Sequence, residues 1–446
     1  MKEIVKPDRF VLKLLSNRQT NGTERRLTRH CVTAECPEGV LFYHTLTGEL
    51  VLAEKDEISS PELRSQLAGK LFFLRDGEDE NRMADSVRRM ISVLKPAKKS
   101  VTGFTVLTTT DCNARCFYCY EKGARRLSMT EETAEKVADH IAEVSRGDRV
   151  KIAWFGGEPL FNRSALTVIT RRLSEKGLPF SSSMTSNGYL FDEDTVKEAS
   201  ELWNLKSVQI TVDGTEAVYN RTKAYISSED NPFARVMRNI GLLADRGITV
   251  FLRLNMNRSN YPDLMKLAGE LGRRFGGREE IKAYPVMLRS FAGEVGEFAD
   301  CKDEVRAYFY LKNELKANRI GRRETIVLEG FPTGRCMADN DGCEVIHPDG
   351  SLAKCEHFDE TEVFGDVFSD IRKEGVTDSW KERVVFDECR VCAMYPRCIN
   401  LKKCAWAAFG CSEALREIRI RQTRDRMLET FYNSSENTGG NNGERS

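Results

Sequence analysis

Apolar and polar positions alternate with two different periods in the central part of this chain. Helical spacing of apolar residues recurs in five stretches, 129–144, 164–177, 192–203, 233–247 and 261–276. Six shorter apolar or β-rich runs stand around them: FTVLTTT, KIAWFGG, FSSSMTSNG, SVQITVDG, ITVFLRLNMN and EIKAYPVML. Strands that alternate with helices predict an α/β fold with a parallel sheet and helices outside. Six such units are enough for a partial barrel.

Polar and Gly-rich segments fall where the predicted strands end. These segments are DCNARC, GGEP, TSNG and VDG. In a barrel of parallel strands, chemistry is located at the carboxyl ends of the strands. We therefore expect a functional site there, and we expect Asn162 and Asp192 to cap the second and third helices.

The segments on either side of the barrel predict further domains. Residues 1–95 form a small α+β unit, with a strand over 11–16, a hairpin around Thr47-Gly48, and helices over 60–73 and 81–95. Residues 95–100 are expected to be a linker. The barrel is expected over 101–300 and a connecting helix, 303–319, within 301–329. Residues 330–432 contain a Cys-rich segment and a charged terminal helix, and the polar tail 433–446 is expected to be disordered.

Charge and composition exclude several classes of function. Lys plus Arg and Asp plus Glu each number 68 among 446 residues, so nothing favours nucleic acid or an anionic membrane as a partner. The first residues, MKEIVKPDRF, contain no apolar run of the signal-peptide type, and no stretch is long enough to span a membrane. We therefore expect a soluble cytoplasmic protein.

The cysteines are distributed very unevenly along the chain. Three of the 14 lie within 112–119 and eight within 336–411. Clustered cysteines in a protein without an export signal favour metal binding over disulfides. Cys112, Cys116 and Cys119 follow a predicted strand directly, and three thiolates leave one iron of a cubic [4Fe–4S] cluster open to another ligand. A zinc ion that takes a further ligand from elsewhere is the alternative.

Two motifs together resemble the radical S-adenosylmethionine (radical SAM) superfamily. The first is Cys112-x3-Cys116-x-Tyr118-Cys119, and the second is Phe155-Gly156-Gly157-Glu158-Pro159, at the end of the next strand. The resemblance implies a partial (β/α)6 TIM-like barrel in which the open iron binds S-adenosylmethionine. Reduction then splits the cofactor to give a 5′-deoxyadenosyl radical, which takes a hydrogen atom from the substrate.

The resemblance also implies a set of cofactor contacts at the ends of the barrel strands. They are Tyr118, Gly156, Gly157, Glu158, Ser186, Asn187, Thr211, Asp213 and Arg221. Thr211 stands where many relatives have Ser, a departure that keeps the hydroxyl group. Arg221 resembles the arginine that pairs with the carboxylate of the cofactor.

The eight later cysteines resemble the SPASM extension of peptide-modifying radical SAM enzymes. The resemblance implies two auxiliary [4Fe–4S] clusters, one held by Cys336, Cys343, Cys355 and Cys404 and the other by Cys389, Cys392, Cys398 and Cys411. Gly350 suits a hairpin turn between Cys336 and Cys355. The spacing of Cys398 and Cys404, and the short gap to Cys411, depart from the pattern. The assignment of Cys404 and Cys411 therefore stays open, and two zinc sites or a redox switch are the alternative.

Three further features are open to two interpretations each. Glu356 follows Cys355, where some sulfatase-maturing relatives have a catalytic base, so it is either a catalytic residue or a plain surface carboxylate. Residues 1–95 have the size and order of a winged-helix-like domain that adds a leader peptide to its sheet edge, or they form a structural cap. Cys31 and Cys36, in the segment HCVTAEC, are either a metal or redox pair or free thiols in a polar loop.

The preferred function is modification of a ribosomally synthesised precursor peptide by a thioether or carbon–carbon crosslink. The partners implied are that peptide and a flavodoxin-like or ferredoxin-like electron donor. An anaerobic sulfatase maturase that forms formylglycine is the nearest alternative. A non-enzymatic electron-transfer or iron-sensing protein is another alternative. The Gly-Gly-Glu-Pro and Asp-Gly elements argue against it, because neither electron transfer nor iron sensing requires a cofactor pocket.

Overall fold

The computed structural model describes residues 1–16, 24–75, 77–93, 100–227, 231–289, 300–322, 328, 336–357, 362–373, 375–398 and 400–439. The chain divides into two compact units. Unit 1 comprises Met1–Pro96, Arg323–Arg335 and Glu382–Ser446, and unit 2 comprises Ala97–Arg322 and Cys336–Lys381. The segment 330–432, expected to be one domain, is therefore divided between the units.

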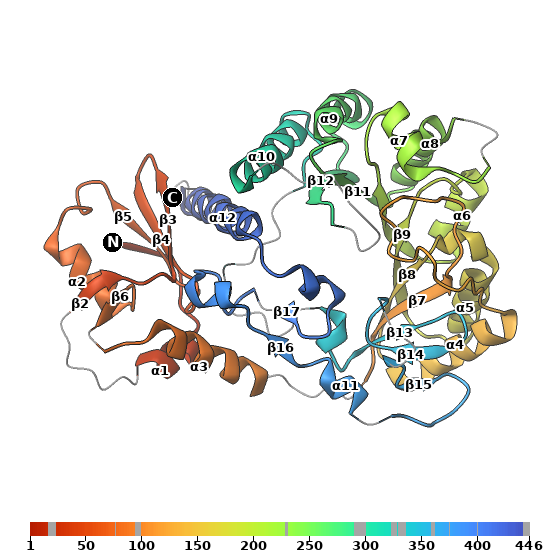
Figure 1. Cartoon of the computed structure of the whole chain (residues 1–446), viewed down its shortest axis with the longest axis horizontal. Coiled ribbons are helices and arrows are strands. Elements are labelled where there is room, and N and C mark those ends of the chain that lie inside the picture. The colour runs from red at the N-terminus through yellow and green to blue at the C-terminus, as the bar shows by residue number, and fades with distance from the viewer. Residues whose placement is uncertain are drawn as a thin grey trace, which may run out of the picture. The chain divides into compact units, whose positions relative to one another are not determined.

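Unit 2 is built on a sheet in which six parallel strands follow the order of the chain (Figure 1). The strands are β7 (Gly103–Thr109), β8 (Val150–Gly156), β9 (Phe180–Ser186), β10 (Leu205–Thr211), β11 (Thr249–Met256) and β12 (Ile281–Met287). Each coincides with one of the six predicted runs. The fold class, a partial (β/α)6 barrel, is confirmed.

Seven helices accompany these strands in the described part of unit 2. They are α4 (Glu131–Ser145), α5 (Arg163–Glu175), α6 (Glu193–Glu201), α7 (Glu216–Lys223), α8 (Pro232–Asp245), α9 (Tyr261–Phe275) and α10 (Cys301–Ala317). All except α7 were predicted. Asp192 caps α6 as expected, because its carboxylate accepts a hydrogen bond from Thr195 N at 2.7 Å. Asn162 does not cap α5, since its side-chain amide donates to Thr108 O and Met129 O, each at 2.9 Å.

The two faces of this sheet differ in polarity. Side chains of the outer face, among them Trp154, Val208 and Leu252, are fully buried under the helices. On the inner face, polar side chains such as those of Gln209 and Arg253 are only partly buried. Successive residues of a strand point to opposite faces, so each strand supplies both the helix-covered core and the polar interior of the barrel.

A second part of unit 2 extends the sheet beyond β7. β13 (Cys343–Ile346) pairs parallel to β7, and β14 (Ser351–Ala353) and β15 (Gly365–Asp366) follow in antiparallel order. Gly350 forms the predicted hairpin turn with a φ of +86°. A short helix, α11 (Val376–Ser379), completes the segment. Because Cys343 pairs with Gly103, this part of the Cys-rich segment belongs to the barrel sheet.

Unit 1 contains a four-stranded antiparallel sheet in the order β1-β5-β4-β3. Its strands are β1 (Lys2–Val5), β3 (Cys31–Cys36), β4 (Gly39–His44) and β5 (Leu50–Glu54). The remaining elements are α1 (Arg9–Ser16), β2 (Glu24–Leu27), α2 (Pro61–Gly69), β6 (Phe73–Arg75), α3 (Glu80–Val93), β16 (Arg383–Val384), β17 (Asn400–Leu401) and α12 (Glu413–Gly439). The predicted hairpin and both predicted helices of residues 1–95 are present.

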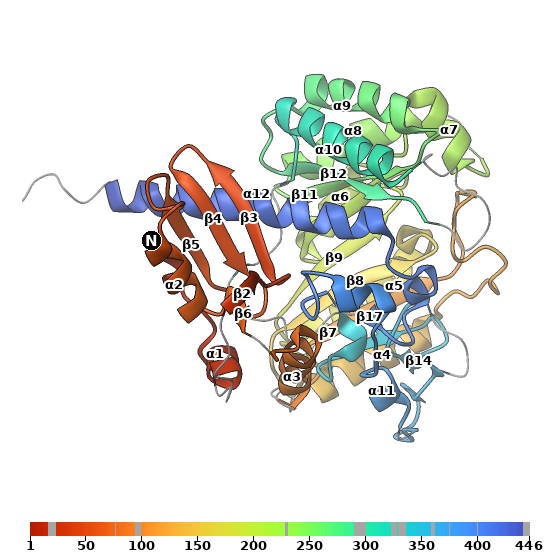
Figure 2. The ribbon, with the colours of Figure 1, turned by 60° about the vertical axis from the view of Figure 1, so that its left-hand side comes forward.

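The C-terminal helix packs on the N-terminal sheet (Figure 2). Met427 and Phe431 of α12 lie in one apolar cluster with Leu41, Tyr43 and Leu52 of the sheet. In addition, the Arg424 guanidinium donates to Thr33 O on β3 at 3.0 Å. The two ends of the chain therefore share one hydrophobic core.

Three expectations for unit 1 are wrong. Residues 11–16 are helical rather than extended, because Val11 and Leu15 bury the same helix face and Asp8 accepts hydrogen bonds from the first turn. The segment with Cys31 and Cys36 is strand β3 rather than a loop. The tail expected to be disordered from residue 433 starts as part of α12, which continues to Gly439.

Two predicted features fall largely outside the described residues: 95–99 of the linker predicted over 95–100, and 440–446 of the tail. Among the helices of the described residues, none is long and apolar enough to cross a membrane.

Candidate functional site

Three predicted cluster ligands lie on the loop that follows β7. The Sγ atom of Cys112 accepts a hydrogen bond from Ala114 N at 3.3 Å, and the side-chain amide of Asn187 lies 3.8 Å from the same sulfur. Burial raises the pKa of Cys112 most, and the charges of Glu158, Cys116 and Cys119 raise it further, which places the other two thiols near Cys112. Hydrogen bonds to sulfur of this kind are a feature of iron–sulfur sites.

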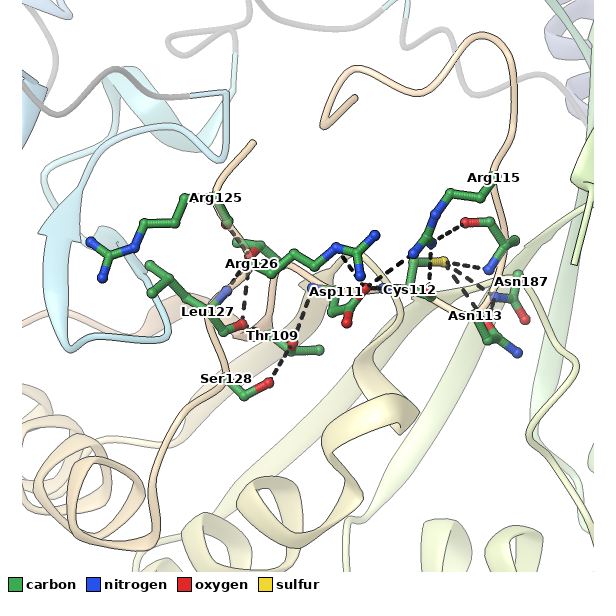
Figure 3. A network of polar contacts seen from close by, with 12 residues as sticks. Thr109, Asp111, Cys112, Asn113, Arg115, Arg125, Arg126, Leu127, Ser128 and Asn187 are labelled. Carbon is green, nitrogen blue, oxygen red and sulfur yellow. Dashed lines mark hydrogen bonds and ion pairs between the residues drawn. The ribbon is translucent and has the colours of Figure 1, made fainter. Parts of the chain in front are cut away.

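Asp111 organises the start of this loop (Figure 3). Its carboxylate accepts a hydrogen bond from Cys112 N at 2.8 Å and pairs with the guanidinium groups of Arg115 and Arg126, each at 3.6 Å. The side-chain amide of Asn187, which reaches the loop from the end of β9, donates to Asn113 Oδ1 at 2.7 Å. The loop is thereby held by polar contacts from both of its flanks.

The Gly156–Gly157 pair allows β8 to approach the cluster loop closely. Gly156 has a φ of +126°, and a Cβ atom there would lie 2.1 Å from Thr109 O. A Cβ atom at Gly157 would lie 2.3 Å from Asp111 O. The backbone N–H groups of Gly157 and Glu158 donate to these two carbonyls at 3.0 and 2.9 Å. The two sequence motifs are thus hydrogen-bonded to each other directly.

Glu158 joins the end of β8 to the end of β9. It is fully buried, and it accepts hydrogen bonds from Ser186 Oγ at 2.9 Å and from Asn187 N at 2.7 Å. Burial raises the pKa of Glu158 to about 7. Three residues with predicted cofactor contacts are therefore in direct contact with one another.

Tyr118 belongs to a buried polar triad that the sequence reasoning did not foresee. Its hydroxyl donates to Asp213 Oδ2 at 2.6 Å and accepts from Lys223 Nζ at 3.1 Å. Lys223 also pairs with Asp213 at 3.0 Å, and both side chains are almost completely buried, at 3% and 1% exposure. Burial lowers the pKa of Lys223, but the Asp213 carboxylate more than offsets this effect and keeps the pKa well above its usual value.

The structure places Arg221 apart from this triad. Arg221 and Lys223 both lie in the last turn of α7, but Arg221 is exposed while Lys223 is buried beside Cys116. The backbone of Lys223 also accepts a hydrogen bond from Arg115 N at 2.8 Å. The spacing of two residues puts the two cations on different sides of α7, which is why a lone basic residue could not be placed from sequence. Thr211 ends β10 and is partly buried.

The donor set of the loop fits a metal–sulfur cluster. Burial, the Glu158 carboxylate and the neighbouring thiols raise the pKa of Cys112 to about 12. A thiol in such a place is deprotonated only when a cation stabilises the thiolate, and a bound cluster supplies that charge. Among the described residues, no three or more His, Cys, Asp or Glu side chains surround a single metal ion. A cubic cluster needs no such convergence, since each thiolate binds a different iron.

The eight later cysteines are divided between the two units. Cys336, Cys343 and Cys355 lie in unit 2, while the other five lie in unit 1. In unit 1, burial raises the pKa of Cys389, and the charges of the nearby Cys411, Cys392 and Cys398 raise it further.

The N–H···S contact of Cys112 recurs at two of these later cysteines. Ala338 N donates to Cys336 Sγ at 3.3 Å, and Met394 N donates to Cys392 Sγ at 3.4 Å. One cysteine of each predicted set therefore has the same local geometry.

Glu356 lies close to the loop of the first cluster motif. The ring of His357 lies 3.9 Å, between centroids, from the ring of Tyr120, which follows Cys119. Burial raises the pKa of Tyr120, and the negative charges of Glu121 and then of Glu356 raise it further. Burial also raises the pKa of Glu121 to about 7, and Tyr120 donates to its carboxylate at 3.3 Å. The segment after Cys355 and the loop after Cys119 therefore meet, which the sequence did not indicate.

A partial (β/α)6 barrel with three cysteines at the end of its first strand defines the class of the protein. Residues 106–271 match the family model of the Radical SAM superfamily. Residues 106–271 therefore form a Radical SAM domain, and such a domain implies a [4Fe–4S] cluster and S-adenosylmethionine.

Relatives with different activities resemble this chain in sequence. A probable GTP 3′,8-cyclase of Methanosarcina mazei is 24% identical over 313 residues, which cover 66% of this chain and 86% of that protein. A cysteine-type anaerobic sulfatase-maturating enzyme of Clostridium novyi is 23% identical over 345 residues, which cover 67% and 87%. These relatives leave the reaction open.

Two solved structures share the fold of this chain. Streptococcus suis SuiB superimposes with a TM-score of 0.51 and 12% identity, over 84% of this chain and 94% of SuiB. The structure of anSMEcpe with bound AdoMet superimposes with a TM-score of 0.51 and 19% identity, over 76% of this chain and 100% of anSMEcpe. At these identities, the likeness concerns the fold alone.

Proposed function

We propose that this protein is a SPASM-type radical SAM enzyme that installs a thioether or carbon–carbon crosslink in a ribosomally synthesised precursor peptide. The observation that carries this proposal is the gathering of four cysteines, Cys389, Cys392, Cys398 and Cys411, in unit 1. A barrel that needed only the cofactor cluster would not require them. The fold agrees, since SuiB has been solved with the precursor peptide SuiA.

The residues of unit 2 would hold the cofactor as follows. Cys112, Cys116 and Cys119 would bind the cluster. The cluster, together with bound S-adenosylmethionine, would supply a 5′-deoxyadenosyl radical. Glu158 keeps the Ser186–Asn187 turn in place beside Cys112. The cationic role that resemblance assigned to Arg221 falls to Lys223, the buried ammonium beside Cys116.

We assign two auxiliary [4Fe–4S] clusters to the remaining cysteines. Cys389, Cys392, Cys398 and Cys411 hold one of them in unit 1. Cys336, Cys343 and Cys355 of unit 2 would contribute ligands to the other. The side chain of Lys354 supports the second group, because its ammonium donates to the carbonyl of Cys343 and, at 2.9 Å, to that of Asn340. These clusters would accept the electron that a substrate radical loses when it forms a closed-shell product.

Further roles complete the proposal. Residues 1–95 would bind the leader of the precursor, a flavodoxin or ferredoxin would reduce the first cluster, and Glu356 would act as the base. The position of Glu356 beside Tyr120 supports the last assignment, because it puts a carboxylate next to the loop that carries the cofactor cluster.

The experiment is an anaerobic incubation of the reconstituted enzyme with reductant, S-adenosylmethionine and candidate peptides encoded beside its gene. We expect 5′-deoxyadenosine and a peptide whose mass is lower by two hydrogen atoms per crosslink. A synthetic sulfatase peptide and GTP serve as parallel substrates, because relatives with those activities exist. Turnover of either one alone would replace the peptide proposal, and an absence of 5′-deoxyadenosine under every condition would contradict it.

The iron content tests the cluster assignment separately. We expect about twelve irons per chain, since each cubic cluster holds four. The Cys392→Ser variant should lose about four of them and the crosslinked product while it still forms 5′-deoxyadenosine. Cys31→Ser is the matched control, because Cys31 and Cys36 lie in different apolar clusters on opposite faces of β3 and form no pair. Full product from a Cys392→Ser variant that has lost its iron would show that this cluster is structural.

A further inference from the structure

The inner face of the barrel carries two arginines on neighbouring elements. In the strand register, Arg253 of β11 stands between Thr211 of β10 and Tyr284 of β12. Paired residues of parallel strands lie on the same face, so all three side chains belong to the interior. Arg322 follows a bridge between Gly321 and Ala283, and its backbone N donates to Ala283 O at 2.9 Å. Its guanidinium reaches back over the rings of Phe251, at 4.8 Å, and Tyr284, at 5.1 Å.

Neither arginine has a carboxylate partner in the described part of the chain. Arg253 Nε donates to the neutral side chain of Asn255 at 2.9 Å, and Arg322 stacks on aromatic rings. Arginines on the helices behave differently, since Arg163 pairs with Glu198 at 2.7 Å and Arg172 with Asp139 at 2.8 Å. The interior of the barrel thus contains two positive charges that the described residues do not neutralise.

Both arginines are neighbours of Tyr284: Arg253 is its partner in the strand register, and the Arg322 guanidinium lies 5.1 Å from the centroid of its ring. Both act on the Tyr284 hydroxyl, where their positive charges lower its pKa against the larger effect of burial. That hydroxyl donates to Gln209 Oε1 at 2.6 Å, which leaves the amide N–H₂ of Gln209 as a further donor beside it. The two guanidinium groups and the amide of Gln209 form a set of hydrogen-bond donors beside a partly buried aromatic wall. This set contains no negatively charged acceptor.

A planar anion fits this set best. Charged groups that are partly removed from water lose hydration free energy unless a partner compensates, and arginine forks match the two oxygens of a carboxylate. The position of these donors in the barrel indicates where the anion would lie relative to the cofactor. Arg253 is paired in register with Thr211, two residues before the Asp213 that binds Tyr118. A ligand of Arg253 and Arg322 would therefore lie in the barrel interior close to the cofactor motifs.

We propose that Arg253 and Arg322 form a carboxylate-binding site that selects an acidic side chain of the substrate peptide, near the residue that reacts. This inference deepens the proposed function, on which it rests. The positive charges would hold the peptide in register, while Tyr284 and Phe251 pack against the side chain that carries the carboxylate. A terminal carboxylate of a peptide and the phosphates of a nucleotide are the other anions that such donors bind.

Small probes test the site without knowledge of the precursor peptide. Ligand-observed NMR on the reconstituted holoenzyme would measure binding of N-acetyl-aspartate amide and of N-acetyl-asparagine amide, which lacks the charge. We expect the aspartate probe to bind at least tenfold more tightly. Arg253→Gln or Arg322→Gln should remove this preference. Arg238→Gln, an exposed position on α8, removes the same charge and should leave it unchanged.

Four outcomes would overturn the proposal. N-acetyl-alanine acid that binds more tightly than the aspartate probe would show that the site holds a peptide terminus. GTP that binds more tightly than either, and loses affinity in Arg253→Gln, would show a nucleotide site. If Arg253→Gln weakens S-adenosylmethionine binding as much as it weakens the aspartate probe, Arg253 serves the cofactor. An absent preference for aspartate in the wild-type holoenzyme would remove the site altogether.

A second arm separates this inference from the proposed function. Once a modified precursor is identified, each of its acidic residues is changed to the amide in turn. One such change should raise KM at least tenfold in the wild type and have little further effect in Arg322→Gln. Crosslinking with no sensitive acidic residue would contradict the inference and leave the peptide function intact. Probe binding without any peptide product would leave the site intact and contradict the function.

Discussion

At the scale of single residues, two glycines determine how closely the cluster loop approaches β8. A side chain at Gly157 would meet the carbonyl oxygens of both Asp111 and Thr110, at 2.3 and 2.8 Å, and these belong to the backbone that leads into Cys112. Backbone atoms cannot move aside as a flexible side chain can. The Gly-Gly pair is therefore required by packing, in addition to any contact with a cofactor.

We predict that Gly157→Ala prevents assembly of the first cluster. The clash displaces the loop, so the purified variant should contain about four irons fewer per chain and form no 5′-deoxyadenosine. Iron analysis and anaerobic turnover measure both effects. Gly241→Ala, in helix α8 with no heavy atom within 4 Å of the added Cβ, is the control and should stabilise slightly. A Gly157→Ala variant with full iron content would show that the loop tolerates displacement.

Glu158 makes the stability of unit 2 depend on pH. Its pKa is raised by burial from 4.5 to about 7, so the folded state binds the proton more tightly than the unfolded state. The contribution of this group to stability is therefore fully present below pH 4.5 and is lost as the pH rises to about 7, by about 3 kcal/mol. Melting temperatures measured from pH 4.5 to 8 for the wild type and Glu158→Gln should differ in slope over this interval. Parallel curves would contradict the prediction.

Lys223 and Asp213 illustrate how burial changes the contribution of an ion pair to the stability of the protein. We predict that Lys223→Met destabilises the protein by about 3–5 kcal/mol, because Asp213 would keep an uncompensated buried charge. The double variant Lys223→Met, Asp213→Asn should recover much of this loss in urea denaturation. Lys176→Met is the matched control, since its pair with Asp139 is exposed and contributes about 0–1 kcal/mol. Equal losses in the two single lysine variants would contradict this account.

At the scale of elements, the sequence predicted the barrel well and the N-terminal unit less well. The six barrel strands and their long helices follow strict periods, because each element must bury one face over several turns or residues. Residues 11–16 are too few to show a period, and the buried pair of Val11 and Leu15 there is compatible with either structure from sequence alone. The strand with Cys31 and Cys36 is similarly short, and its pairing with β4 is decided by tertiary contacts.

The candidate site could be predicted where chemistry and spacing coincide within one segment. The cysteines of the first motif and the residues of the Gly-Gly-Glu motif are of this kind. Lys223 was missed because its importance depends on burial, which distinguishes it from Arg221 only in three dimensions. Arg253 and Arg322 were missed for a related reason, since residues from two separate segments of the chain become neighbours of the same residue, Tyr284, only in the folded structure.

At the scale of the whole molecule, the first 96 residues and the last part of the chain form one unit. Cys389 and Tyr395 pack in an apolar cluster with Val11, Leu15 and Leu46 of the N-terminal segment. Arg397 donates from Nε to Thr45 O at 2.6 Å and from Nη2 to Leu328 O at 3.1 Å. The residues expected to bind a leader peptide therefore also support the segment that carries four predicted cluster ligands.

We predict that deletion of residues 1–96 removes more than leader recognition. The deletion would expose Met427, Phe431 and Cys389, which the N-terminal residues now bury, so the variant should lose about four irons or aggregate. A deletion cannot then separate leader binding from cluster assembly. Arg397→Ala tests the same link while residues 1–96 stay in place. The substitution breaks two contacts of a side chain placed between β4 and the cysteines. It should lower the iron content without removing any ligand. A deletion variant with full iron content would show that the C-terminal segment folds by itself, and the N-terminal unit would then be free to serve recognition alone.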